Sequence, residues 1–260
     1  MTDFPGSILH VEYRTDRPVA VLTLDAPPLN VVTVPTREHF ATVFREIENN
    51  PDVRAVIVRG AGDQALSSGG DIGGFLKASP EYLRHLAENV AAPERCSKPV
   101  IARLAGYVLG VGLEIALACD FRIAADTTQI GLPEIKLGMI PGSGGTQRVT
   151  RIVGVGRAMD MILRARRLSA EEAKAWGLLT EVVPLAELDT RIDALIDELL
   201  TLAPLAFKAG KQAIHAAMET PLSAGLAFEG NLYGFLRTTE DFHEGVMAFR
   251  EKRRAHFQGK

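Results

Sequence analysis

Short apolar runs rich in Val, Ile and Leu alternate with longer amphipathic stretches along the first half of the chain. The apolar runs predict strands at residues 8–13, 19–24, 55–60, 100–104 and 121–125. The longer stretches predict helices at residues 35–49 and 80–95, and a third helix after Gly112. Strands and helices that alternate in this way favour an α/β fold.

From Gly144 onward the pattern becomes mainly helical. Ser169, with Glu172 three residues later, forms a capping-box pattern that begins one helix, and Gly177 is placed to end it.

The C-terminal part reads as helical throughout, and Pro204 and Pro221 stand where proline can begin a helix. We therefore expect a boundary near Leu185. It separates an α/β core of residues 1–185, which holds the candidate site, from a helical region of residues 186–260.

The composition of the 260 residues excludes several classes of protein. Hydrophobic residues make up 47% of the chain, enough for a sizeable core. The net charge of -3 gives no basic surplus for a nucleic acid, and no stretch is apolar enough for a membrane helix or a signal peptide. Cys96 and Cys119, the only cysteines, lie outside any metal-ligand cluster. We expect a cytoplasmic protein without metal, membrane or nucleic-acid partners.

A glycine-rich segment at residues 66–75 follows the strand predicted at residues 55–60. Its central residues are Ser68, Gly69, Gly70, Asp71 and Ile72. Glycine lets a backbone approach a ligand closely, although a segment of this kind is, taken alone, more often a flexible surface turn.

A second segment, residues 106–120, places the single acidic residue Glu114 inside an apolar stretch. A buried carboxylate must be paired, hydrogen-bonded or shifted in pKa, so it is either a structural group with a backbone or Arg partner or a functional acid. Gly110 and Gly112 precede it and allow a tight turn, from which backbone N–H groups at the helix start could face an oxyanion.

A third segment, residues 131–148, carries Glu134 on a predicted loop, followed by a glycine cluster that opens a helix. The Lys-Ser/Thr pair of a phosphate-binding loop is missing, and residues 110–115 lack the third glycine of a dinucleotide fingerprint. The cluster is therefore interpreted as a helix entry whose positive end faces the reaction centre.

These three segments in this order, together with residues 168–184 and 244–257, resemble the enoyl-CoA hydratase/isomerase (crotonase) superfamily over most of the chain. The resemblance implies a core of repeated ββα units wound in a spiral, with a helical C-terminal trimerisation region. It also implies an acyl-CoA substrate, assembly as a homotrimer or homohexamer, and no cofactor besides the coenzyme A carried by the substrate.

Carried over residue by residue, the resemblance implies that the N–H groups of Gly70 and Val111 form an oxyanion hole for the thioester carbonyl. It implies that Glu114 activates water at Cβ and that Glu134 moves the proton at Cα. Val111 stands where the family commonly has a glycine, and Gly73 stands where it often has a basic residue. These departures concern pocket shape and CoA contacts, since a backbone donor needs no particular side chain.

Further residues are assigned to the substrate by the same resemblance. Phe249 and Lys252 match positions that reach the CoA of a neighbouring subunit. The remaining substrate-binding candidates flank the two donors: Ser68, Gly69, Asp71, Ile72 and Gly110.

The presence of both glutamates favours an enoyl-CoA hydratase over an isomerase, which commonly lacks one of them. A hydratase or dehydratase of a cyclic or branched acyl-CoA stays open, because the sequence does not indicate the acyl group. A non-catalytic scaffold is the alternative from another class, although neither a lost acid nor a charged nucleic-acid patch supports it.

Overall fold

The computed structural model describes residues 4–260, which divide into two compact units. The first unit holds the described residues up to Cys96 together with Val100–Asp193, and the second holds Ser97–Pro99 and Ala194–Lys260. The division falls within α10 (Leu188–Leu199), a few residues after the boundary expected near Leu185.

Two sheets form the frame of the first unit. The larger sheet has the order β1-β2-β3-β5-β7-β10, in which only β1 is antiparallel to its neighbour. Its strands are β1 (Leu9–Tyr13), β2 (Val19–Leu24), β3 (Ala55–Gly60), β5 (Val100–Leu104), β7 (Phe121–Ala125) and β10 (Glu181–Val183). The smaller sheet, ordered β4-β6-β8-β9, consists of β4 (Ala65–Ser67), β6 (Tyr107–Leu109), β8 (Gln129–Gly131) and β9 (Arg167–Ser169).

The chain repeats one pattern three times as it builds these sheets. A strand of the larger sheet, β3, β5 or β7, is followed by a strand of the smaller sheet, β4, β6 or β8, and then by helix. The helices that follow are α2 (Ile72–Phe75), α6 (Val111–Ala118) and, after the 3-10 helix η1 (Glu134–Leu137), α7 (Gly145–Val153). The expected α/β fold of repeated ββα units is confirmed.

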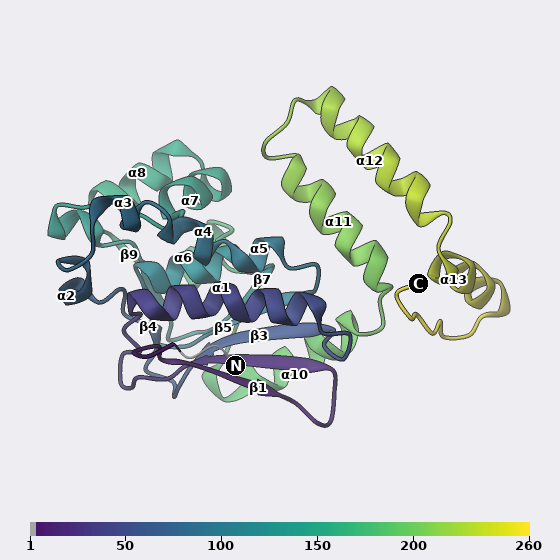
Figure 1. Ribbon diagram of the computed structural model, residues 1–260, viewed down its shortest axis with the longest axis horizontal. Coiled ribbons are helices and arrows are strands. Elements are labelled where there is room, and N and C mark those ends of the chain that lie inside the picture. The colour runs from purple at the N-terminus through teal and green to yellow at the C-terminus, as the bar shows by residue number, and fades with distance from the viewer. Residues whose placement is uncertain (1–3) are drawn as a thin grey trace. The chain divides into compact units, whose positions relative to one another are not determined.

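Helix α1 (Val34–Asn49) lies beside the larger sheet (Figure 1), and its buried residues belong to the core of this unit. Thr33 caps its start, because the hydroxyl accepts a hydrogen bond from the N–H of Thr36. Phe40 and Phe44 are buried and join Leu22 of β2 in one hydrophobic cluster. Since β3 and β5 are covered on both sides, their residues are apolar almost without interruption, as the predicted strands required.

The prediction of one helix at residues 80–95 is wrong. The structure has three short helices there, α3 (Pro80–Leu83), α4 (Leu86–Val90) and α5 (Ala92–Arg95). Pro93 explains one of the breaks, because proline has no N–H for a bond to the preceding turn. The remaining helices of this unit are α8 (Val155–Leu163), α9 (Ala170–Ala175) and the 3-10 helix η2 (Leu185–Glu187). Ser169 caps α9 by accepting from the N–H of Glu172, as predicted.

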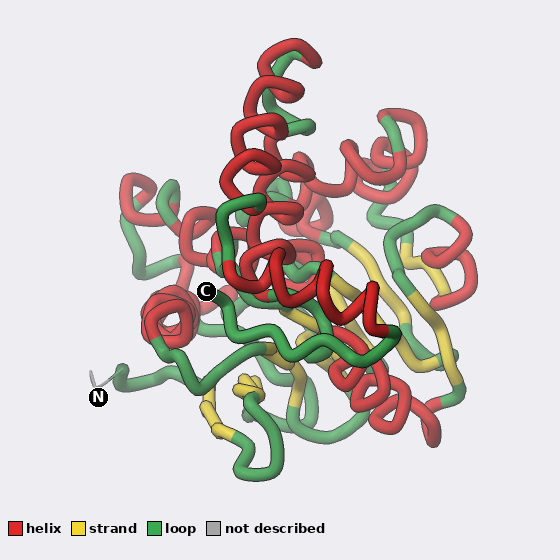
Figure 2. Tube along the Cα trace, turned by 90° about the vertical axis from the view of Figure 1, so that its right-hand side faces the viewer, coloured by secondary structure: helices red, strands yellow, loops and turns green. Residues whose placement is uncertain are grey.

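The second unit contains α11 (Pro204–Ala216), α12 (Leu222–Leu236) and α13 (Glu240–Glu251), of which α11 and α12 lie side by side (Figure 1). Pro204 begins α11, and Pro221 immediately precedes α12. The chain then ends in a non-helical tail, drawn as loop in Figure 2, which the helical prediction missed. The carboxylate of Asp241 accepts from the N–H groups of Gln258 and Gly259 and holds this tail.

Within residues 4–260, no helix combines the length and the apolar content needed to cross a membrane.

Candidate active site

The two glycine-containing turns meet because their strands are neighbours. β4 and β6 pair in parallel, so the segments after Ser67 and Leu109 leave the same edge of the smaller sheet. A methyl group placed on Gly110 would fall 3.3 Å from the Cα of Gly69. Gly110 has a φ of +54°, a conformation that L side chains rarely adopt, so this close turn depends on glycine.

Two backbone N–H groups at this edge have no hydrogen-bond partner within the described residues. Val111 is the first residue of α6, so its N–H has no acceptor inside the helix. Among residues 4–260, neither this N–H nor that of Gly70 forms a hydrogen bond. A methyl group on Gly70 would lie 2.7 Å from the ring of Phe75, which leaves no room for a side chain. The geometry therefore keeps two N–H groups available for an anionic oxygen.

Glu114 lies in the first turn of α6 with its side chain buried. Its Oε1 accepts hydrogen bonds from the N–H of Ser143 at 2.7 Å and from that of Gly145 at 2.8 Å. Gly145 is the first residue of α7, so the positive end of this helix faces the Glu114 carboxylate. Burial raises the pKa of Glu114, while the two donors and the charges of Arg37 and Arg148 oppose that rise.

Glu134 begins η1 and approaches the same turn. Its Oε1 would lie 3.1 Å from a methyl group on Gly110, and its Oε2 is buried without a hydrogen-bond partner. Burial is the largest cause that raises the pKa of Glu134, to about 7, and the negative charge of Glu114 adds to it. The two carboxyl groups therefore influence each other, but Glu114 accepts from the N–H groups of Ser143 and Gly145, whereas Glu134 accepts from its own backbone N–H.

Arg37 is a buried residue of this site that sequence reasoning missed. Its Nη1 donates to Ser143 Oγ at 2.8 Å, and its Cζ lies 5.1 Å from the centre of the Phe75 ring. Burial lowers the pKa of Arg37, and the charges of the two glutamates counteract this. Arg37 precedes Phe40 by three positions, so helical periodicity already placed it on the apolar face of α1.

A second arginine fixes the loop that leads into α7. Arg148 donates from Nη1 to the carbonyl oxygen of Ser143 at 2.9 Å and forms an ion pair with Glu94, with Nη2 2.7 Å from Oε2. Gly144 has a φ of +101°, and a methyl group there would collide with the Arg148 guanidinium. Ser143 is therefore held from two sides, by Arg37 at its hydroxyl and by Arg148 at its carbonyl.

The other predicted site residues have varied surroundings. The N–H of Ser68 donates to the carbonyl of Leu29, and that of Gly69 to the hydroxyl of Ser67. Asp71 caps α2 by accepting from the N–H of Gly73 at 3.0 Å, while Ile72 is exposed. Phe249 and Lys252, at the end of α13, belong to the second unit, and their role at a neighbouring CoA stays a prediction.

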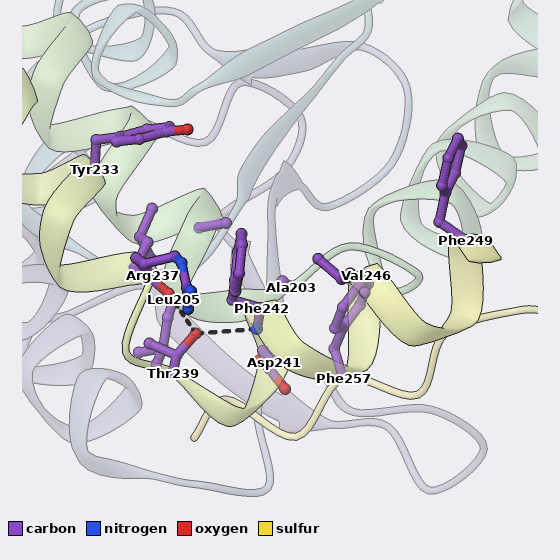
Figure 3. Close-up of a pocket in the computed structure, with 13 residues that line it drawn as sticks. Ala203, Leu205, Tyr233, Arg237, Thr239, Asp241, Phe242, Val246, Phe249 and Phe257 are labelled. Carbon is purple, nitrogen blue, oxygen red and sulfur yellow. Dashed lines mark hydrogen bonds between the residues drawn. The ribbon is translucent and has the colours of Figure 1, made fainter.

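The second unit has an apolar hollow of about 440 Å³ (Figure 3). Aromatic and aliphatic side chains dominate its lining, which includes Leu205, Tyr233, Phe242, Val246, Phe249 and Phe257. The one carboxylate in the lining, Asp241, is occupied by the N–H groups of the C-terminal tail. The hollow therefore differs from the surroundings of Glu114, where two carboxyl groups lie close to backbone donors.

Glu134 also gives the fold a dependence on pH that can be measured. Its pKa is about 7 in the folded chain, against an ordinary value of 4.5. Between these values the folded chain holds a proton that the unfolded chain releases, so the free energy of unfolding falls as pH rises through this window and levels off above it.

Glu134→Gln removes this titration. Allowing for partial exposure of the side chain, we expect the variant to gain about 1 kcal/mol, or roughly 2–4 °C in Tm, at pH 8 relative to wild type. At pH 5 the two proteins should melt at similar temperatures. Thermal melts at both pH values test this, and an identical difference in Tm at pH 5 and pH 8 would contradict the raised pKa.

The chain is similar to known proteins over almost its whole length. The chain matches the model of the family described as Enoyl-CoA hydratase/isomerase over residues 14–260. It is 39% identical to the short-chain-enoyl-CoA hydratase of Clostridium acetobutylicum, over 91% of this chain and 92% of that protein. It is 35% identical to the (E)-benzylidenesuccinyl-CoA hydratase of Thauera aromatica, over 93% of this chain and 96% of that protein. The crystal structure of an enoyl-CoA hydratase from Bacillus anthracis matches with a TM-score of 0.90 and 35% identity, over 98% of this chain and all of that one.

Proposed function

The chain belongs to the enoyl-CoA hydratase/isomerase family and has the crotonase fold, and from this premise we propose that it adds water across the α,β double bond of an enoyl-CoA thioester. The observation that carries the proposal is the meeting of two carboxyl groups, Glu114 and Glu134, with two unpartnered backbone donors. An isomerase of this fold needs one acid to move a proton, whereas hydration uses two groups.

The N–H groups of Gly70 and Val111 are proposed to bind the thioester carbonyl oxygen. Attack of water at Cβ moves an electron pair towards that oxygen, which becomes the anionic oxygen of an enolate. Donors that are already oriented stabilise this charge without reorganisation, an effect of about 3–4 kcal/mol for each donor. The position of Val111 at the positive end of α6 adds to the attraction.

The two glutamates are proposed to divide the proton transfers. Glu114, with two hydrogen bonds to its Oε1, is the carboxylate that takes a proton from water as the oxygen bonds to Cβ. Glu134, with a pKa of about 7 and an unpartnered Oε2, is the acid that gives a proton to Cα. Exchange with solvent then returns each group to its starting form.

A panel of short, long, branched and cyclic enoyl-CoA thioesters tests whether the protein hydrates such substrates and which acyl group it accepts. The named substrates of the relatives range from short-chain enoyl-CoA to (E)-benzylidenesuccinyl-CoA, so the panel includes both kinds. Hydration is followed as loss of the absorbance of the conjugated thioester. Loss of this absorbance with at least one thioester of the panel supports the proposal. No loss with any member, together with conversion of a β,γ-unsaturated thioester into a conjugated one, would assign an isomerase instead.

We also propose that the chain assembles as a homotrimer or homohexamer. Large apolar side chains of the second unit are exposed, among them Leu222 and Tyr233, both 78% exposed, and Phe249 at 85%. Patches of this kind mark interaction surfaces. Light scattering after size exclusion should give three or six times the mass of the 28.1 kDa chain. A monomer at micromolar concentration would remove the basis for assigning Phe249 and Lys252 to a neighbour's substrate.

A further inference from the structure

We propose that Arg37 is a positioning residue that keeps Glu114 in its carboxylate form and leaves the transferable proton on Glu134. The inference rests on the proposed function, because it explains how two neighbouring carboxyl groups acquire different roles. Arg37 lies on α1 and contacts Ser143, whose N–H donates to Glu114.

A short hydrogen-bonded path joins Arg37 to Glu114. Arg37 Nη1 donates to Ser143 Oγ at 2.8 Å, and the N–H of the same serine donates to Glu114 Oε1 at 2.7 Å. The guanidinium thereby fixes the residue that supplies one of the two donors to the carboxylate. Arg148 holds the carbonyl of the same serine, so Arg37 supplies one of the two side-chain contacts that position this donor.

Neither an ion pair within residues 4–260 nor solvent weakens the effect of the Arg37 charge on neighbouring groups. The side chain is 5% exposed, its Nε is buried without an acceptor, and among residues 4–260 its nitrogens form no ion pair. Its single side-chain acceptor is the neutral hydroxyl of Ser143. A guanidinium that is neither neutralised nor screened by solvent interacts strongly with charges several ångströms away.

The charged groups around the two acids are distributed unequally. The charges of Arg37 from α1 and Arg148 from α7 act on Glu114, which also receives two backbone hydrogen bonds, and its own charge acts on Glu134 of η1. Glu134 faces Arg37 and Glu114, and its Oε2 receives no hydrogen bond. Two adjacent carboxyl groups do not ionise equally, so the better stabilised one becomes the anion. Arg37 gives that advantage to Glu114, both through its charge and through Ser143.

The test is a titration of Glu114 by carboxyl ¹³C NMR in protein with labelled glutamate. It is carried out in the Glu134→Gln background, where the neighbouring acid cannot share the transition. Adding Arg37→Met should raise the Glu114 midpoint by about one pH unit or more, the size expected for loss of a nearby opposite charge. Arg37→Lys, which keeps the charge, should recover most of the shift. With Glu134 intact, the acid limb of kcat/KM should move in the same direction, since kcat/KM reports the free enzyme.

Two further variants separate this role from a structural one. Ser143→Ala keeps the N–H that reaches Glu114 but removes the acceptor of Arg37, so the midpoint should move in the same direction by less. Arg45→Met, at an exposed position of the same helix, should leave the titration unchanged.

A Glu114 midpoint in folded Arg37→Met that coincides with the parent would overturn the inference. So would an unmoved acid limb together with a selective loss of activity towards acyl-CoA that carries a second carboxylate, because Arg37 would then recognise substrate. If Arg37→Met does not fold, an unchanged titration in Ser143→Ala is the overturning result. If wild type hydrates no enoyl-CoA, the proposed function fails, while the titration still decides the role of Arg37.

Discussion

Glu114→Gln and Glu134→Gln are each expected to lower kcat for hydration by about 10²-fold or more, with binding of a saturated acyl-CoA retained. Glutamine cannot take or give the proton, but its amide oxygen can still accept the N–H bonds of Ser143 and Gly145. The variants should therefore fold, and the loss should lie in the chemical step. Steady-state kinetics gives kcat, and calorimetric titration with the saturated thioester gives the affinity.

The double variant should lose less than the product of the single losses, because both groups serve one transition state. Glu171→Gln, at an exposed position of α9, is the matched control and should keep full activity. If only Glu134→Gln is inactive and a β,γ double bond is moved into conjugation, the isomerase interpretation is correct. If neither replacement affects any acyl-CoA reaction, the carboxylates are structural, and a non-catalytic scaffold becomes the favoured interpretation.

The central strands of the larger sheet, β2, β3 and β5, could be predicted because burial on both faces makes them apolar runs of five or six residues. β2, β3, β5 and β7 have the predicted bounds, and β1 begins one residue later. The strands of the smaller sheet span only three residues each, too few to display an alternating pattern, and their pairing depends on segments distant in the sequence. Local pattern therefore predicted five strands of the larger sheet, but it missed the three-residue strand β10 and the smaller sheet whose edge carries the backbone donors.

The candidate site shows the same division between local and distant signals. Glu114 stood out in the sequence because an acid within an apolar helix demands a partner, and the structure supplies Ser143 and Gly145 as that partner. Arg37 gave a similar signal on the apolar face of α1, but an arginine beside other polar residues at a helix start is usually solvated. Its contact with Ser143 spans 106 residues, and nothing local indicates it.

Val111→Pro is expected to lower kcat by about 10²–10³-fold, the effect of removing one donor from an oxyanion hole. Val111 is the first residue of α6, where proline fits the helix because that position has no intrahelical bond to lose. Gly110 before it lacks the Cβ that would clash with the proline ring. The substitution thus removes one N–H from the site while the helix can still form.

The matched control is Val111→Ala, which also loses the buried branched side chain but keeps the N–H. Its free energy of unfolding should be lower than that of wild type by about 1 kcal/mol or more, since a buried side chain is shortened. Its rate of hydration should stay close to that of wild type. Kinetics and thermal melts of both variants separate lost packing from a lost donor. If Val111→Pro is folded and turns over like the alanine variant, the second donor to the thioester oxygen must come from another residue. If both variants lose activity equally, the isopropyl group of Val111 shapes the acyl site, and its N–H is not what the reaction needs.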